Sequence, residues 1–168
     1  GDRPFAVLLP DDIILQGNAF LSKMLQVSHQ RGASVLALKR VPPETISRYG
    51  AVSATEISRN LYEIHGVVEK PKMEDAPSDL AVIGRYILSP SIFGILSSTK
   101  PGALGEVQLT DAIAQLIDVE PVYGVIVEGE HFDVGTPEGM LMCALTLALE
   151  QPHMRAPLQR LFSDWAPK

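Results

Sequence analysis

The sequence predicts an α/β layer fold in a single domain. Short apolar runs alternate along the chain with stretches whose apolar residues recur at helical spacing, which is typical of strands and helices that pack in layers. The length of 168 residues suits one domain. Hydrophobic residues make up 46% of the chain and charged residues 20%. This balance excludes a disordered protein, which would be poor in apolar residues.

The first half of the chain is predicted to hold four strands and one helix. Apolar residues at helical spacing predict the helix over residues 19–31, with Gly32 as its C-terminal cap. The apolar run at residues 5–9 indicates a buried strand, although the pattern provides no evident partner for it. Turn-rich alternation after residue 46 predicts antiparallel hairpins. The predicted strands are residues 5–9, 34–41, 50–57 and 61–69.

The second half is predicted to alternate strands with helices. Ser89 and Thr136 each precede a proline, and a capping side chain followed by proline is typical of a helix start. Pro121 ends the helix before it. The predicted strands are residues 80–88, 122–127 and 132–133, and the predicted helices are residues 89–98, 110–119 and 136–150, with an amphipathic stretch at 158–165.

Charge and cysteine content narrow the class of protein. The net charge of −6, from 14 basic and 20 acidic residues, gives no electrostatic basis for binding nucleic acid. The longest apolar run covers ten residues, 140–149, whereas a membrane span needs about 20. A single cysteine, Cys143, cannot form an intrachain disulfide, and no signal segment opens the chain. We expect a soluble, acidic, cytoplasmic protein.

Two acidic residues follow the first predicted strand. Asp11 and Asp12 come just after residues 5–9, and ligands of open α/β sheets bind outside the carboxyl ends of the strands. Carboxylates there suit a hard divalent ion, since Mg²⁺ takes one or two of them together with substrate phosphates. The alternative is that Asp11 only stabilises the turn after Pro10, where aspartate is a favoured residue.

A second acidic candidate lies near the end of the chain. Asp133 stands between an aromatic and a β-branched residue and close to Gly135, which indicates a polar side chain that turns into a cleft. The alternative is a hydrogen-bonded loop aspartate before a helix. His131 is the weaker candidate, because a lone histidine is more often a surface or hydrogen-bonded residue. The other histidines, His29, His65 and His153, show no metal-ligand spacing.

A third candidate closes the hairpin strand at residues 61–69. Glu69 suits sugar hydroxyls and Lys70 suits a phosphate. Adjacent strand residues point to opposite faces, so both reach one site only if Pro71 distorts the strand end. The alternative is an ordinary solvated charge pair.

Several motifs of catalysis and nucleotide binding are absent from the sequence. Neither the G-x-x-x-x-G-K-[ST] loop nor the G-x-G-x-x-G turn occurs. There is no G-x-S-x-G and no cysteine–histidine set, so acyl-transfer chemistry has no support.

Taken together, six segments give the chain a specific resemblance. It resembles the bacterial UTP–glucose-1-phosphate uridylyltransferases, or UDP-glucose pyrophosphorylases, over about residues 4–149. Each segment is weak alone, and their order makes the match specific. The segments are residues 5–12 (FAVLLPDD), 49–52 (YGAV), 68–71 (VEKP), 81–86 (AVIGRY), 105–113 (GEVQLTDAI) and 132–135 (FDVG).

The resemblance implies a Rossmann-like nucleotide-diphospho-sugar transferase fold, an α/β/α sandwich. It implies transfer of a uridylyl group from UTP to glucose 1-phosphate, with Mg²⁺ as cofactor and UDP-glucose and pyrophosphate as products. The motif at residues 106–111 is interpreted as structural. The implied site residues are Asp11 and Asp133 for the metal, Asp12 and the Gly50 backbone for glucose, Glu69 for the sugar hydroxyls and Lys70 for the phosphates, with Asp11, Lys70 and Asp133 forming the catalytic set.

The chain also departs from this family. The family carries a glycine-rich Gly-x-Gly-Thr-Arg loop in about its first 100 residues, and no such loop occurs here. Residues 1–168 are therefore expected to form the sugar- and metal-binding part of the catalytic domain, truncated at the N-terminus and inactive alone. One alternative is another sugar-1-phosphate nucleotidyltransferase, such as a thymidylyltransferase. The other is a non-catalytic domain with a sugar-phosphate-binding or regulatory role.

The predicted helix at residues 137–150 is apolar around nearly its whole circumference. A surface helix on a monomer should carry a polar face. We expect a homo-oligomer, with this helix or the open edge of the strand at residues 5–9 at the contact. The alternative is that Phe20, Ile113 and Leu161-Phe162 cover the helix within one chain.

Overall fold

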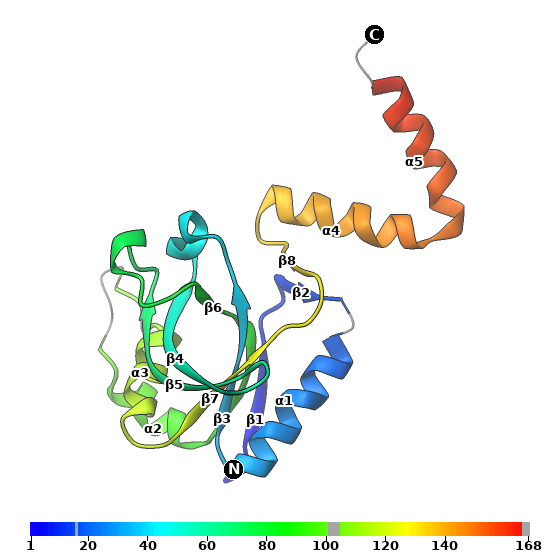
Figure 1. The fold of residues 1–168 in the computed structure, drawn as a ribbon. Coiled ribbons are helices and arrows are strands. Elements are labelled where there is room, and N and C mark those ends of the chain that lie inside the picture. Colours follow the sequence, from blue (N-terminus) through cyan, green and yellow to red (C-terminus); the bar gives the residue numbers. More distant parts are fainter. Residues whose placement is uncertain (16, 101–104, 166–168) are drawn as a thin grey trace.

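The computed structural model describes residues 1–15, 17–100 and 105–165, and its elements follow the predicted order (Figure 1). Three short elements were not predicted: strand β2 and the 3₁₀ helices η1 and η2. The strands are β1 (Phe5–Leu8), β2 (Asp12–Ile14), β3 (Ser34–Arg40), β4 (Gly50–Ser58), β5 (Leu61–Glu69), β6 (Leu80–Leu88), β7 (Val122–Ile126) and β8 (His131–Asp133). The helices are α1 (Gly17–Arg31), η1 (Pro43–Arg48), η2 (Met73–Asp75), α2 (Ser91–Ser98), α3 (Leu109–Ile117), α4 (Pro137–Glu150) and α5 (Pro152–Trp165).

A six-stranded sheet in the order β1-β6-β3-β7-β5-β4 forms the centre of the molecule. Of the pairings in this sheet, β3–β7 is parallel and the others are antiparallel. Strand β4 also pairs with the start of β6, where Gly50 lies opposite Val82, so that the sheet curls round on itself. The predicted α/β class is confirmed, and the predicted hairpin β4–β5 is present.

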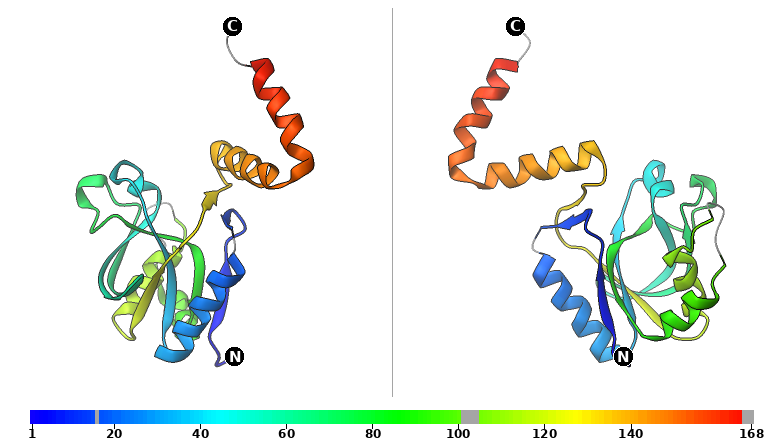
Figure 2. Two further views of the ribbon diagram at one scale, coloured as in Figure 1. Left: turned by 45° about the vertical axis from the view of Figure 1, so that its right-hand side comes forward. Right: turned by 180° about the vertical axis from the view of Figure 1, so that it is seen from behind.

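The sheet has a buried layer on each face. Strand β3 shows this directly, because its alternating side chains enter two different clusters. Leu36 and Leu38 pack toward α2 and α3, and Val35 and Ala37 pack toward α1. Figure 2 shows α1 on one side of the sheet and α2 and α3 on the other. This double burial explains why residues 35–38 form a continuous apolar run.

Strand β1 differs from its prediction as a buried strand. It pairs with β6 alone and therefore forms an edge of the sheet. Its side chains alternate in burial, and Leu8 is 49% exposed. The prediction failed because a continuous apolar run is typical of a strand with neighbours on both sides, and β1 has a neighbour on one side in the part of the chain that the structure describes.

The two predicted side-chain caps had different outcomes. Thr136 caps α4 as expected, since its hydroxyl accepts a hydrogen bond from the Gly139 N–H at 3.1 Å. Ser89 does not cap α2: the N-cap residue is Pro90, and the Ser89 hydroxyl has no hydrogen-bond partner among the described residues. Instead, the Ser89 N–H donates to the Ser34 hydroxyl at 3.0 Å, which ties the start of α2 to β3.

Two glycines provide a matched test of packing. A Cβ on Gly124 in β7 would overlap the Leu38 side chain, whereas a Cβ on Gly94 in α2 would meet nothing within 4 Å. We expect Gly124→Ala to lower the free energy of unfolding by about 1–3 kcal/mol through overpacking. Gly94→Ala should raise it by up to about 1 kcal/mol, because alanine favours a helix. Urea denaturation of both variants measures the difference, and equal stabilities would contradict the described packing of β7 on β3.

Helices α4 and α5, which we call the arm (residues 137–165), extend away from the sheet in both views of Figure 2. Helix α5 leaves the end of α4 at a steep angle and contacts it near the bend between them. The alternative, that Phe20, Ile113 and Leu161-Phe162 cover α4 within one chain, is not seen among the described residues. Phe20 and Ile113 pack in the two core clusters of the sheet, and Leu161 and Phe162 are themselves about half exposed. No helix in the described ranges has both the length and the apolar character to cross a membrane. The large arm residues that are 41–59% exposed are Met140, Leu141, Met142, Leu147, Leu149, Leu161 and Phe162.

Candidate active site

The two carboxylates expected to hold a metal lie together at the β2–β8 ribbon. In this ribbon Asp12 pairs with Asp133, and the Val134 N–H donates to the Asp11 carbonyl at 2.7 Å. A Cβ built on Gly135 would lie 3.0 Å from Asp133 Oδ1 and 3.1 Å from Asp11 Oδ2. The two oxygens therefore flank one small space that glycine leaves open. Carboxylate oxygens are the ligands that hard divalent cations prefer in proteins.

The end of β5 turns sharply so that two adjacent residues face one cavity. Lys70 has φ +43°, in the left-handed region that non-glycine residues rarely adopt. Its N–H donates to the Tyr49 carbonyl at 3.0 Å, and its ammonium lies 3.6 Å from the Glu69 carboxylate. This backbone conformation removes the usual strand alternation, so both Glu69 and Lys70 line the cavity. The distortion is at Lys70 itself, one residue before Pro71.

Gly50, the first residue of β4, lies beneath two polar side chains. A Cβ there would be 3.5 Å from Glu69 Oε2 and 3.6 Å from the Thr110 hydroxyl. Glycine thus leaves the Gly50 backbone accessible and lets Glu69 and Thr110 approach each other. A carboxylate, a hydroxyl and an open backbone together suit a ligand with several hydroxyl groups.

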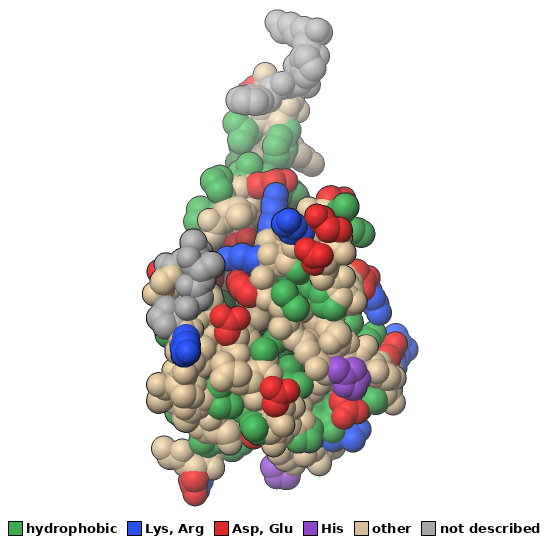
Figure 3. Space-filling view, turned by 90° about the vertical axis from the view of Figure 1, so that its left-hand side faces the viewer, with side chains coloured by type: hydrophobic (Ala, Val, Ile, Leu, Met, Phe, Trp, Pro, Cys, Tyr) green, Lys and Arg blue, Asp and Glu red, His purple; other side chains and the backbone are tan. Residues whose placement is uncertain are grey.

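One cavity of about 350 Å³ joins these features. Its size falls within the range of small-molecule sites. Figure 3 shows acidic and basic side chains gathered around a hollow on this face. All six residues singled out in the sequence line it: Asp11, Asp12, Gly50, Glu69, Lys70 and Asp133.

The cavity wall is acidic overall. Four carboxylates line it (Asp11, Asp12, Glu69 and Asp133), against two cationic side chains (Arg48 and Lys70). A phosphate would meet net repulsion from such a wall, and a divalent cation would offset it. Among the described residues, no group of three or more metal-ligating side chains occurs. A cation here would therefore take most of its ligands from the bound molecule or from water.

The acidic wall also affects two tyrosines. Burial, together with the nearby carboxylates of Asp12, Glu69 and Asp11, raises the pKa of Tyr86 to about 12. Burial and then Asp133 and Asp12 raise the pKa of Tyr49. Both phenols therefore remain neutral hydrogen-bond donors at physiological pH.

Sequence reasoning missed several residues of the cavity wall. Arg48 and Tyr86 were not singled out, and residues 106–111 were interpreted as structural. The structure places Gln108, Leu109 and Thr110 on the wall, at the start of α3. The available signal was their position at the start of a predicted helix, because binding groups often lie where a loop joins a helix.

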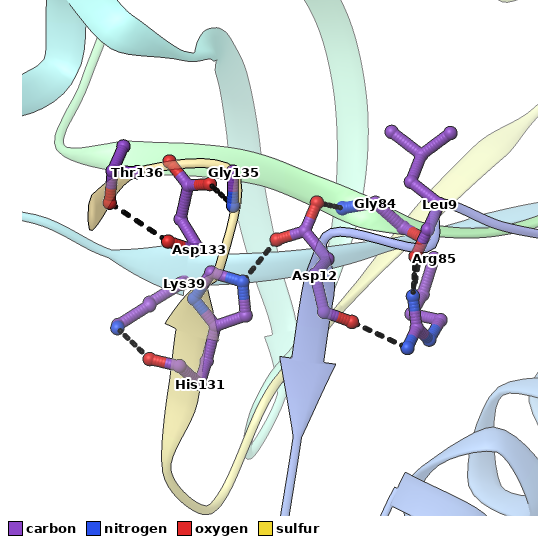
Figure 4. A network of polar contacts seen from close by, with 9 residues as sticks. All are labelled: Leu9, Asp12, Lys39, Gly84, Arg85, His131, Asp133, Gly135 and Thr136. Atoms are coloured by element: carbon purple, nitrogen blue, oxygen red, sulfur yellow. Dashed lines mark hydrogen bonds and ion pairs between the residues drawn. The ribbon is translucent and has the colours of Figure 1, made fainter. Parts of the chain in front are cut away.

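Asp12 lies in the cavity wall with both carboxylate oxygens already engaged (Figure 4). Oδ2 accepts a hydrogen bond from the Gly84 N–H at 3.0 Å, and Oδ1 contacts Nε2 of His131. A Cβ on Gly84 would overlap Oδ2, so glycine is needed there for this approach. His131 is buried and hydrogen-bonded.

Comparison with known proteins shows the family of this chain. Residues 1–149 match the family model described as nucleotidyl transferase. The chain therefore belongs to the nucleotidyl transferase family. It is 38% identical to a UTP–glucose-1-phosphate uridylyltransferase of Bacillus subtilis, over 98% of this chain and 55% of the relative. It is 41% identical to a UTP–glucose-1-phosphate uridylyltransferase of Pseudomonas aeruginosa, over 84% of this chain and 51% of the relative.

Solved structures give the same result for the fold. A crystal structure of UDP-glucose pyrophosphorylase complexed with UDP-glucose matches with a TM-score of 0.86 and 38% identity, over 90% of this chain and 58% of the other. The resemblance to uridylyltransferases and the Rossmann-like transferase fold are thus confirmed. The chain spans about half the length of the curated relatives it matches.

Proposed function

We propose that this chain carries the sugar-phosphate- and metal-binding part of a UTP–glucose-1-phosphate uridylyltransferase. The proposal rests mainly on one observation: a single cavity is lined by all four residues that suit these ligands. Asp11 and Asp133 suit a metal ion, Glu69 suits sugar hydroxyls, and Lys70 suits a phosphate. The relatives named above, which are uridylyltransferases, support UTP as the nucleotide and glucose 1-phosphate as the sugar substrate. On this proposal, residues 1–168 form part of one catalytic domain.

The proposed cofactor is Mg²⁺. Nucleotidyl transferase family enzymes generally use a divalent metal ion. Asp11 and Asp133 would hold it, because Mg²⁺ typically takes one or two carboxylates and completes its shell with substrate phosphates and water. When bound, the ion would neutralise phosphate charge beside the acidic wall.

The remaining residues would bind and orient the substrates. Glu69 and the Gly50 backbone would hydrogen-bond glucose hydroxyls, and Asp12 would contact the sugar through a lone pair that its protein partners leave free. Lys70 would pair with the phosphates. A phosphate oxygen of the sugar would attack the α-phosphorus of UTP in line, forming one P–O bond as the bond to pyrophosphate breaks. No enzyme group needs to gain or lose a proton, so the work is orientation and charge neutralisation.

The chain has no glycine-rich nucleotide loop in its sequence. We therefore propose that it binds the sugar phosphate by itself and turns over only when a nucleotide-binding part is supplied. A pyrophosphate-release assay with UTP and glucose 1-phosphate tests this. We expect no release by the chain alone, and release when the unmatched part of the Bacillus subtilis relative is added. Release that stays absent in the mixture, although both parts are folded, would favour a non-catalytic binding domain.

We also propose that the protein is a homo-oligomer and that it acts in the cytoplasm. The single cysteine suits a reducing compartment, and the proposed substrate UTP is an intracellular nucleotide.

The arm supports the proposal of a homo-oligomer, because its seven exposed apolar side chains each present on the order of 100 Å² of accessible surface. Their sum approaches the ~800 Å² that each partner contributes to a standard interface. Every copy carries this surface, so two arms related by a two-fold axis can cover each other.

Negative charge introduced on the arm should dissociate the proposed homo-oligomer into monomers. We expect the wild-type chain to run above its monomer mass of 18.2 kDa at micromolar concentration, and the Leu141→Glu/Phe162→Glu variant to run as a monomer. Burying two carboxylates in an apolar contact costs far more than the contact gains. Val119→Glu is the matched control, because Val119 is 70% exposed and lies after α3, outside the arm. Light scattering after gel filtration measures the masses, and a soluble wild-type monomer would contradict the proposal.

A further inference from the structure

The ribbon that carries Asp11 and Asp133 is too small to hold itself in place. Strands β2 and β8 have three residues each and, among the described residues, pair only with each other. Two-stranded hairpins without a larger sheet are marginal in water. The Leu9 N–H donates to the Gly84 carbonyl at 2.9 Å and ties the chain just before the ribbon to β6. Within the ribbon itself, the connection to the main sheet is made by side-chain contacts.

One buried side-chain pair provides this connection (Figure 4). Nε2 of His131 contacts Oδ1 of Asp12 across the ribbon, with the side chains 1% and 15% exposed. The other oxygen, Oδ2, accepts from the Gly84 N–H in β6 at 3.0 Å, and the Asp12 carbonyl accepts from Arg85 Nη2 at 2.6 Å. Asp12 thus joins β8 to the main sheet through its carboxylate.

A second contact ties His131 to another strand of the main sheet. Lys39 of β3 donates to the His131 carbonyl at 3.4 Å. His131 is therefore held by its backbone to β3 and by its ring to Asp12, which is bound to β6. Asp133 follows it by two residues, and Asp11 directly precedes Asp12. Loss of the His131–Asp12 contact would remove one link between the strand that ends in Asp133 and the segment that carries Asp11.

We propose that His131 is a positioning residue that acts through Asp12 to hold Asp11 and Asp133 at the spacing a divalent cation requires. This inference rests on the proposed function, because it assumes that Asp11 and Asp133 are the metal ligands. A pair that only supported the fold would affect stability but not the affinity for the ion. Residues behind metal ligands typically change metal affinity 10–100-fold when replaced.

The experiment measures Mn²⁺ affinity from the electron paramagnetic resonance signal of the free ion, with UDP-glucose present to supply phosphate ligands. We expect His131→Leu to weaken Mn²⁺ binding about tenfold or more. His131→Gln should retain most of the affinity, since the glutamine amide reaches about as far as Nε2. His65→Leu is the control, because the His65 ring bonds Thr55 on the exposed β4–β5 hairpin. Urea denaturation of each variant confirms that it is folded.

The outcomes separate this inference from the proposed function. If Asp11→Asn leaves Mn²⁺ binding unchanged, the proposed metal site is wrong. If Asp11→Asn loses binding and His131→Leu keeps it, the positioning role is overturned. Should His131→Leu fail to fold, His131→Asn takes its place, because its shorter amide falls short of Asp12. Equal Mn²⁺ affinity in the Asn and Gln variants would then overturn the inference.

Discussion

Asp11→Asn is expected to abolish the gain in UDP-glucose affinity that Mg²⁺ produces, a loss of at least about tenfold, or 1.4 kcal/mol. The asparagine side chain has the same size but no charge, and Asp11 Oδ2 is one of the two oxygens that flank the space beside Gly135. Asp133→Asn should have the same effect. Calorimetric titration of UDP-glucose with and without Mg²⁺ measures the gain.

The same variants should remain folded. Asp11 is exposed and lies in a wall with four carboxylates, so removing one charge relieves repulsion, and the free energy of unfolding should stay constant or rise slightly. Asp118→Asn, at an exposed site after α3, is the control for charge alone. A Mg²⁺-dependent gain of wild-type size in both Asp11→Asn and Asp133→Asn would rule out these residues as ligands.

Lys70→Gln is expected to weaken glucose 1-phosphate binding by about 10–100-fold. The charge-assisted hydrogen bond that is lost is worth about 1.5–3 kcal/mol. Titration calorimetry in the presence of Mg²⁺ measures the affinity. The neighbouring Lys72→Gln is the matched control, since Lys72 is exposed and does not line the cavity.

Lys70→Gly separates the phosphate contact from the backbone strain. Glycine adopts the φ of +43° at no steric cost, so this variant should be as stable as the wild type, or more stable by up to about 1–2 kcal/mol. Its affinity for glucose 1-phosphate should nevertheless fall as far as that of Lys70→Gln. Wild-type affinity in the glycine variant would show that the lysine charge has no part in binding.

Local pattern was enough to predict most elements of the fold. Prolines, caps and periodicity placed β5 and β6 at their observed bounds and β3 to within one residue. Pairing partners could not be predicted in this way, because they depend on contacts between distant segments. Strand β1 shows the difference: its apolar sequence suggested burial, while its place at the sheet edge left Leu8 half exposed.

The candidate site could be predicted where the type and position of a residue indicated what it binds. Asp11, Glu69, Lys70 and Asp133 were found from strand ends and from the family resemblance, and they share one cavity. The His131–Asp12 contact could not be found, because the two residues are 119 positions apart and a lone histidine has no spacing signal. Thr110 was missed for a similar reason, since only the fold brings α3 beside Gly50.

The most direct test of the proposed site is a nuclear magnetic resonance titration of the ¹⁵N-labelled chain with glucose 1-phosphate in the presence of Mg²⁺. We predict that the amide signals that move most belong to the cavity wall, at Gly50, Lys70, Gly84 and Thr110. The β4–β5 turn around Asn60 should not respond, because it does not line the cavity. Signals that stay fixed at the wall, or that move mainly at the turn or on the arm, would contradict a sugar-phosphate site in this cavity.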